Sequence, residues 1–219
     1  MTVETRRWCV SNKTQMQIDY EKLGTEIRAS FSELLKQHVP SDFCEKAKQR
    51  ELTKIISVAC GKFIEAECLS EYFSFCKNLK FYGIEINEPL LNQAKERLVV
   101  ESGKKNVFLK IADASELDNY VEWINDGLFN LIVVRHPEIT FNTNIFMKIF
   151  AVCFGLLEKG GLLLITTHLE NEKKAVKYLL EMLGFKILVE IENTNAASSE
   201  QDGKTVYADK FLFIATSEA

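Results

Sequence analysis

Several residues that can bind a ligand or carry a proton come directly after short apolar runs of the chain. They are Gly61, Glu85, Asp113, Arg135 and His136. A carboxylate accepts hydrogen bonds on two oxygens, so an acid such as Glu85 can hold two neighbouring hydroxyl groups. Histidine titrates near neutral pH, and arginine can clamp a carboxylate or a phosphate. Together these side chains suit the binding of a polar ligand and the transfer of a proton.

The apolar runs that precede these residues have the pattern of buried strands. They are predicted at Ile55–Ala59, Phe81–Ile86, Val107–Ile111, Phe129–Val134 and Leu162–Thr167. Stretches with helical spacing of apolar residues separate them. Strands that alternate with helices predict a parallel sheet with right-handed crossovers. Such sheets bind ligands at the carboxyl ends of their strands, which is where the polar residues lie.

The C-terminal part of the chain departs from this alternation. Ile187–Glu192 and Phe211–Thr216 have the composition of strands, and the polar stretch between them has no room for a crossover helix. These two strands are therefore expected to pair antiparallel, as a hairpin with a long loop.

In this order the features resemble the class I S-adenosylmethionine-dependent methyltransferases, over roughly residues 54–216. The resemblance rests on the first loop, Glu85, Asp113 and the strand pattern taken together. It implies an α/β fold with a seven-stranded, mostly parallel Rossmann-like sheet and an antiparallel C-terminal hairpin strand. It also implies S-adenosylmethionine as cofactor, S-adenosylhomocysteine as product, and a small-molecule or protein methyl acceptor that the sequence does not identify.

The resemblance assigns roles to residues after the first three strands. In that family the first loop wraps the methionyl part, an acid after the second strand holds the ribose hydroxyls, and Asp or Asn after the third takes the adenine amino group. The predicted cofactor-binding residues are Ala59, Cys60, Gly61, Glu85, Ile86, Asp113, Ala114 and Arg135. Glu85 follows Gly61 by 24 residues, close to the roughly 20 expected between a nucleotide-binding loop and its ribose acid. Two alternatives remain open: a solvated charge for Glu85, and an N-cap of the following helix for Asp113.

The first loop departs from the family pattern, which is an acid followed at alternate positions by three glycines. Those positions are Ser57, Ala59, Gly61 and Phe63, so the acid and two of the glycines are absent. Ala59 fits the pattern if its φ stays negative, because it adds one methyl group. Phe63 is expected to lie against the cofactor-binding region and to narrow it.

Arg135 and His136 are the candidate catalytic residues, because the family places residues that face the methyl group or the acceptor after the fourth strand. His136 can take a proton from the acceptor, and Arg135 can hold an anionic acceptor. His136 can instead be a hydrogen-bonded structural histidine before Pro137, and Arg135 can pair with Glu138 or another nearby acid. The Asn/Asp-Pro-Pro-Tyr signature of amino-group methyltransferases is missing here, which argues against exocyclic-amine and glutamine-amide acceptors.

The N-terminal segment and one long loop are expected to flank the site. Residues 1–53 are interpreted as an N-terminal helical cap, and residues 54–219 as the cofactor-binding domain. Tyr20 and His38 would then either reach the acceptor or pack against the sheet. Asn193–Thr205 is expected to act as a lid.

The composition of the chain indicates which classes of partner and which cellular compartment to expect. A net charge of −4 argues against duplex nucleic acid as a partner. The six cysteines and three histidines show no metal-binding spacing, so no metal ligand is assigned and the thiols are interpreted as reduced. The start of the chain lacks the apolar run of a signal peptide, and no apolar stretch is long enough to cross a membrane. A cytoplasmic protein without membrane contact is expected.

Two other functions remain open. The departures in the first loop fit a methyltransferase-like domain that has lost turnover and serves as a cofactor-binding or protein-interaction module. A nicotinamide-linked Rossmann enzyme is a third candidate, but it needs the three-glycine fingerprint. The sequence determines neither the oligomeric state nor the atom methylated.

Overall fold

The computed structural model describes residues 24–102, 106–125, 127–201 and 204–217. The strands are β1 (Thr53–Val58), β2 (Leu79–Glu85), β3 (Val107–Ile111), β4 (Phe129–Arg135), β5 (Leu157–Thr167), β6 (Phe185–Glu192), β7 (Ser198–Gln201), β8 (Lys204–Tyr207) and β9 (Phe211–Ser217). The helices are α1 (Gly24–His38), α2 (Ser41–Gln49), α3 (Glu65–Tyr72), α4 (Glu88–Ser102), the 3₁₀ helix η1 (Ala114–Asn119), α5 (Val121–Ile124), α6 (Thr143–Leu156) and α7 (Glu170–Met182).

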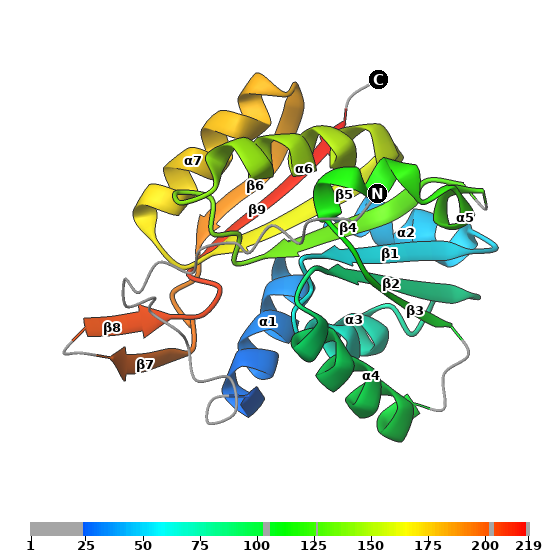
Figure 1. Ribbon diagram of the computed structural model, residues 1–219, viewed down its shortest axis with the longest axis horizontal. Coiled ribbons are helices and arrows are strands. Elements are labelled where there is room, and N and C mark those ends of the chain that lie inside the picture. Colours follow the sequence, from blue (N-terminus) through cyan, green and yellow to red (C-terminus); the bar gives the residue numbers. More distant parts are fainter. Residues whose placement is uncertain (1–23, 103–105, 126, 202–203, 218–219) are drawn as a thin grey trace, which may run out of the picture.

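One large sheet runs through the molecule in the order β3-β2-β1-β4-β5-β9-β6 (Figure 1). The first five of these strands pair in parallel, whereas β9 runs antiparallel between β5 and β6. Every residue of β1 is buried, as expected for a strand covered on both faces. The predicted α/β fold is confirmed, with its seven-stranded, mostly parallel sheet and an antiparallel C-terminal strand.

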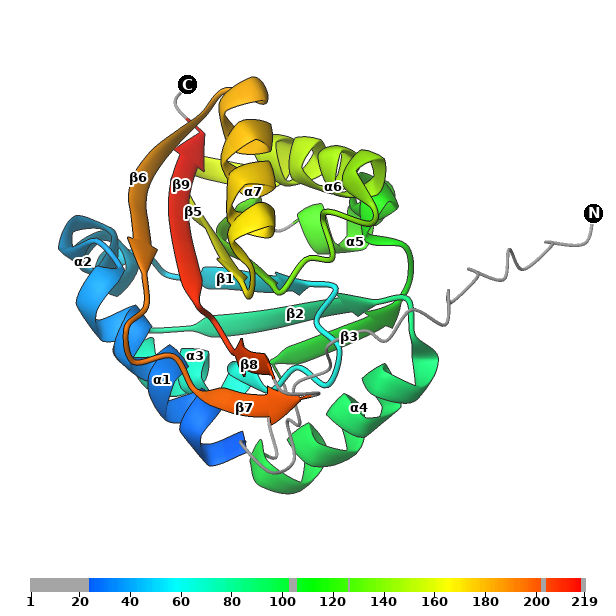
Figure 2. The ribbon, with the colours of Figure 1, turned by 90° about the vertical axis from the view of Figure 1, so that its left-hand side faces the viewer.

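The segment between β6 and β9 differs from the single long loop that was expected. The antiparallel pairing of these two strands is confirmed, but β7 and β8 form a second, two-stranded antiparallel sheet between them. This short hairpin lies beside α1 at one end of the large sheet (Figures 1 and 2). Each of its strands has four residues, and β7 carries only polar ones, so no alternation of apolar residues marked them.

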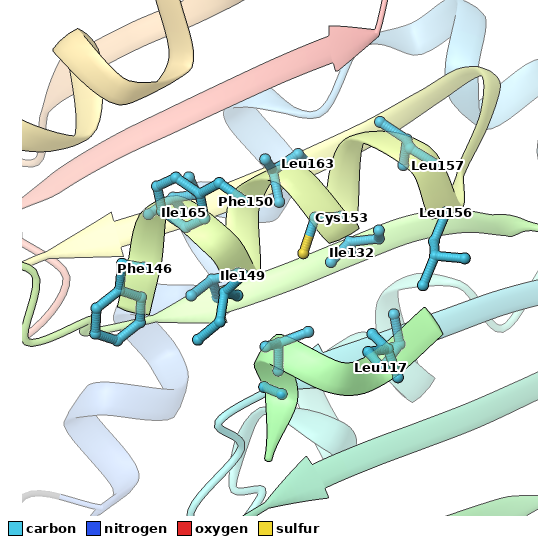
Figure 3. Packing of buried hydrophobic residues seen from close by; sticks show 14 of the residues in the cluster. Leu117, Ile132, Phe146, Ile149, Phe150, Cys153, Leu156, Leu157, Leu163 and Ile165 are labelled. Atoms are coloured by element: carbon cyan, nitrogen blue, oxygen red, sulfur yellow. The ribbon is translucent and has the colours of Figure 1, made fainter. Parts of the chain in front are cut away.

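Helices cover both faces of the sheet and bury an apolar layer on each side. The helices η1, α5, α6 and α7 cover one face, where Phe150 of α6 packs with Ile132 and Ile165 (Figure 3). The helices α1 to α4 cover the other face, whose core includes Val133. Because successive residues of a strand point to opposite faces, Ile132 and Val133 belong to different layers.

The first two helices are part of the second layer. Phe31 of α1 and Phe43 of α2 belong to the same buried cluster as residues of β1. The interpretation of residues 1–53 as a cap on residues 54–219 stays a prediction, since the first 23 residues, with Tyr20, lie outside the described part of the chain.

None of the helices in the described ranges is long and apolar enough to cross a membrane. Cys60, Cys68 and Cys153 are buried free thiols, in keeping with their apolar surroundings. Burial raises the pKa of each of these thiols.

Candidate functional site

The residues with predicted roles lie at one edge of the large sheet, where the parallel strands β1 to β4 end. In the sheet, β1 lies between β2 and β4, and β2 lies between β1 and β3. The loop that contains Gly61 follows β1, Glu85 ends β2, Asp113 follows β3, and Arg135 ends β4. The fold therefore brings the ends of four neighbouring strands, and the predicted residues on them, to one edge.

The loop after β1 has an unusual backbone at the three positions where the family pattern has glycine. Ala59, Gly61 and Phe63 have φ values of 52°, 52° and 51°. This left-handed region suits glycine, and a non-glycine residue held there is strained by about 1–3 kcal/mol. The condition under which Ala59 would fit the pattern without strain, a negative φ, is therefore not met. The loop has the glycine-type conformation without two of the glycines.

Phe63 does not narrow the binding region, contrary to expectation, because its side chain is fully buried in the second core layer. Gly83 of β2 leaves the space for this ring. A Cβ atom at Gly83 would stand 3.2 Å from Cδ1 of Phe63 and 2.6 Å from Cδ2 of Leu109. Burial of a phenylalanine stabilises a fold by about 1.5–3 kcal/mol, which offsets the strain at Phe63.

Two side chains from neighbouring elements hold this loop in place. Glu85, 8% exposed, accepts hydrogen bonds from the N–H of Gly61 on Oε2 and from the N–H of Asn87 on Oε1, both at 2.8 Å. Arg97 of α4 donates from Nη2 to the carbonyl oxygens of the two residues after Gly61, at 3.0 and 2.6 Å. Glu85 is thus a buried, hydrogen-bonded carboxylate. Each of its oxygens has a second lone pair that a ligand can use.

The remaining predicted cofactor residues lie at the ends of β2 and β3, which pair in parallel. Asp113 is partly buried, and its Oδ1 accepts a hydrogen bond from the N–H of Ser115 at 2.8 Å. The N-cap role that the sequence left open is thus present, and adenine binding by Asp113 stays a prediction. Ala114 is buried, whereas Ile86, beside Glu85, is 53% exposed. An exposed apolar side chain next to an acid suits contact with an aromatic base.

Arg135 is held by two buried acids. Its Nε and Nη2 donate to the two carboxylate oxygens of Asp209 at 3.1 and 2.6 Å, and its Nη1 lies 3.5 Å from Oε2 of Glu65. The side chain of Arg135 is 7% exposed, that of Glu65 3%, and that of Asp209 0%. The guanidinium also lies 4.4 Å from the ring centroid of Phe31. The ion pair that the sequence left open for Arg135 is present, with acids distant in the chain.

His136 contacts the same aspartate. Its Nε2 lies 2.8 Å from Oδ1 of Asp209, and its ring stacks on that of His168 at a centroid distance of 3.8 Å. Burial lowers the pKa of both imidazoles, that of His168 to about 3, so both are neutral at pH 7. Although burial opposes the charge of Asp209, the neighbouring Arg135 and His136 hold its pKa well below its usual range.

Sequence reasoning gave no role to Glu65 and Asp209, nor to His168 and Thr166, which contact His136 and Asp209 respectively. The hydroxyl of Ser57 donates to Oε1 of Glu65, so α3 brings a carboxylate to the position where the family pattern has its acid. An acid in the first turn of the helix after the loop was the available signal. Asp209 stands 74 residues after Arg135 and follows a polar stretch, so nothing in its local sequence pointed to this partner.

Several residues at the edge where β1 to β4 end have a strained backbone. Among the described residues, the non-glycine residues with left-handed φ are Ala59, Phe63, His136 and Asp209. Such conformations concentrate at binding and catalytic sites, where the surrounding structure maintains them. Within the same residues, no cluster of three or more His, Cys, Asp and Glu side chains is arranged to hold a metal ion.

The β7–β8 hairpin packs on the N-terminal half of α1. Nδ2 of Asn193 donates to Oγ of Ser30 at 3.1 Å, and an apolar cluster joins α1 to β8 and its neighbours. The lid expected at Asn193–Thr205 is therefore packed down on α1, and its function as a lid stays a prediction. His38 ends α1, eight residues beyond Ser30, or about 12 Å along the helix axis, which places it away from this edge.

Comparison with known proteins finds similarity in structure but not in sequence. No known protein family's sequence profile matches the chain, and no curated protein matches it. A structure described as StiE O-MT superposes with a TM-score of 0.62 at 14% identity, covering 91% of this chain and 76% of that one. An S-adenosylmethionine-dependent methyltransferase from Clostridium acetobutylicum gives 0.57 at 14% identity, covering 91% and 99%. Magnesium protoporphyrin IX methyltransferase from Synechocystis, solved with bound S-adenosylmethionine, gives 0.54 at 14% identity, covering 93% and 86%.

Similarity at this level of identity identifies a fold and leaves the substrate open. The sheet order, with its first five strands parallel and β9 inserted antiparallel, agrees with these structures and with the resemblance seen in the sequence. The chain has the Rossmann-like fold of the class I S-adenosylmethionine-dependent methyltransferases.

Proposed function

We propose that this protein binds S-adenosylmethionine across the ends of β1, β2 and β3 and transfers its methyl group to a small-molecule or protein acceptor. The observation that carries the proposal is the loop after β1. It keeps a left-handed backbone at Ala59, Gly61 and Phe63, and the carboxylate of Glu85 holds its centre. Strained backbone of this kind concentrates at ligand-binding sites, and the neighbouring Glu85 provides a carboxylate that can accept hydrogen bonds from a ribose.

The contacts of Glu85 and Asp113 support their proposed roles. Each Glu85 oxygen accepts one backbone hydrogen bond, at 2.8 Å, and keeps a lone pair for one ribose hydroxyl. Asp113 uses Oδ1 to cap η1, so its Oδ2 is assigned to the adenine amino group. The exposed Ile86 would lie against the adenine ring, and Ala59–Gly61 would follow the methionyl part.

The rate of methyl transfer depends mainly on how the cofactor and the acceptor are positioned. When bound, the cofactor supplies an electrophilic methyl group, and attack by the acceptor is an in-line displacement that benefits from orientation and exclusion of water. His136 is neutral at pH 7 because burial lowers its pKa, so it can accept a proton from the acceptor. Arg135 would contact a ligand only by giving up part of its contact with Glu65 or Asp209.

A second candidate function is cofactor binding without turnover. The observation that favours it is the burial of both candidate catalytic side chains, which are 7% exposed for Arg135 and 11% for His136. Both are engaged with Asp209, so an acceptor that needed either one would have to displace a buried contact. The protein would then act as a binding or interaction module.

Composition and thiol chemistry support the proposed partners and compartment. The net charge of −4 favours an acceptor other than duplex nucleic acid. The five cysteines of the described residues are free thiols, which fits the reducing cytoplasm.

A thermal-shift panel tests the cofactor. A ligand that binds only the folded state at 100 times its Kd adds about 2.7 kcal/mol of stability. S-adenosylmethionine and S-adenosylhomocysteine should raise the melting temperature, and NAD should not. A response to NAD alone, or to none of the three, would overturn the proposal. Transfer of a labelled methyl group to small molecules and proteins then separates the two candidate functions, because the binding module shows no product.

A further inference from the structure

Glu65 is a buried carboxylate at the first position of α3, directly after the left-handed loop. Its Oε1 accepts a hydrogen bond from the hydroxyl of Ser57, and its Oε2 lies 3.5 Å from Nη1 of Arg135. Its side chain is only 3% exposed. Both ends of the loop, at Ser57 and at Glu65, therefore meet at this carboxylate.

Among the described residues, the charges in contact with Glu65 do not balance. Arg135 makes its two short contacts, at 3.1 and 2.6 Å, with Asp209, and its contact with Glu65 is longer, at 3.5 Å. His136 and His168 add no positive charge, because burial lowers their pKa. In this group one guanidinium faces two buried carboxylates. A buried carboxylate with incomplete compensation is unfavourable unless a further cation pairs with it.

We propose that Glu65 binds the α-ammonium group of the cofactor, and so supplies from α3 the carboxylate that is absent at Ser57. This inference rests on the proposed function. An ammonium group can donate directed hydrogen bonds to Oε2, whereas a sulfonium has no hydrogen to donate. Because the group lies almost out of water, the charged hydrogen bond is stronger than at the surface.

Titration calorimetry with three ligands tests the proposal on the full-length protein. S-adenosylmethionine and S-adenosylhomocysteine carry the ammonium group, whereas 5′-methylthioadenosine keeps adenine, ribose and thioether but lacks the amino-acid part. Glu65→Gln keeps the size of the side chain and an acceptor for Ser57. It should weaken the first two ligands by about 10- to 100-fold, the range for a charged hydrogen bond, and leave 5′-methylthioadenosine unchanged. The matched control is Glu71→Gln, an exposed acid of the same helix, which should change none of the three.

Glu85→Gln separates this inference from the proposed function, since it should weaken all three ligands alike through their common ribose. Failure of the wild-type protein to bind any of the three would overturn the proposed function and this inference together. An equal loss for all three in Glu65→Gln, a loss for S-adenosylmethionine alone, or no loss would overturn the inference alone.

If Glu65→Gln does not fold, the proposal can still be tested on the wild-type protein by changing the ligand. Wild-type protein should bind S-adenosylhomocysteine about 10- to 100-fold more tightly than the analogue whose amino group is replaced by hydrogen. Equal affinity for these two ligands would refute an ammonium-binding role for Glu65.

Discussion

Removal of the negative charge of Asp209 should destabilise the protein strongly. Asp209→Asn is the informative change, because asparagine tolerates the φ of 52° at this position and the backbone can stay as it is. Arg135, 7% exposed, would lose its charged partner. Loss of one member of a buried ion pair costs about 3–5 kcal/mol. Glu65, at 3.5 Å from Arg135, retains part of the compensation, so we expect about 3 kcal/mol.

Urea denaturation followed by circular dichroism measures this loss, with the m-value unchanged if the unfolded state is the same. For a chain of this size about 3 kcal/mol corresponds to a melting temperature lower by roughly 6–12 °C. Asp118→Asn, at an exposed aspartate, is the control and should change stability by less than about 0.5 kcal/mol. Adding Arg135→Met and Glu65→Gln to Asp209→Asn should restore most of the loss, because no unpaired charge then remains in this buried group. A loss below about 1 kcal/mol, or no recovery in the triple variant, would refute the reasoning.

Three further predictions concern the loop, its support and the histidine pair. Phe63→Gly should lower the free energy of unfolding by about 2–4 kcal/mol, because loss of the fully buried ring exceeds the relief of backbone strain; a urea midpoint at or above wild type would contradict this. Gly83→Ala should cost about 1–3 kcal/mol in thermal denaturation, since its Cβ would stand 2.6 Å from Leu109. Burial lowers the pKa of His168 from 6.5 in the unfolded chain to about 3 in the folded protein. The folded protein therefore has its full stability above pH 6.5 and loses about 1.4 kcal/mol per pH unit as the pH falls from 6.5 to about 3. His168→Gln should flatten that pH dependence, and an unchanged slope would contradict the burial of a neutral imidazole.

The sheet could be predicted from the sequence because its signals are local. Several of the buried strands contain consecutive apolar residues, and the absence of helical spacing between β6 and β9 leaves antiparallel pairing as the available geometry. The same local pattern placed Glu85 and Asp113 at strand ends. The short strands β7 and β8 were not predicted, because β7 has only polar residues and four-residue strands are too short to show such a pattern.

The network around Asp209 could not be predicted, because its contacts join residues far apart in the chain. The partners of Arg135 lie 70 and 74 residues away, and no spacing rule links them. The left-handed backbone at Ala59 could not be predicted for a related reason. Glu85 accepts a hydrogen bond from the loop and Arg97 donates one to it, each from another element, so tertiary contacts hold the left-handed conformation where two of the glycines are absent. The ring of Phe63 fits into the core because Gly83 of β2 has no side chain at the point where the two residues meet.

Titration calorimetry of S-adenosylhomocysteine into wild-type protein and Glu85→Gln is the most direct test of cofactor binding at this edge. We expect one ligand per chain for the wild type. Glu85→Gln should weaken binding by at least about 10-fold, because hydrogen bonds from ribose to a charged carboxylate contribute about 1.5–3 kcal/mol each. The variant's unfolding should stay cooperative, which a parallel thermal scan checks. Absence of binding to the wild type, or equal affinity in both proteins, would show that the ends of β1 and β2 do not form a binding site for this cofactor.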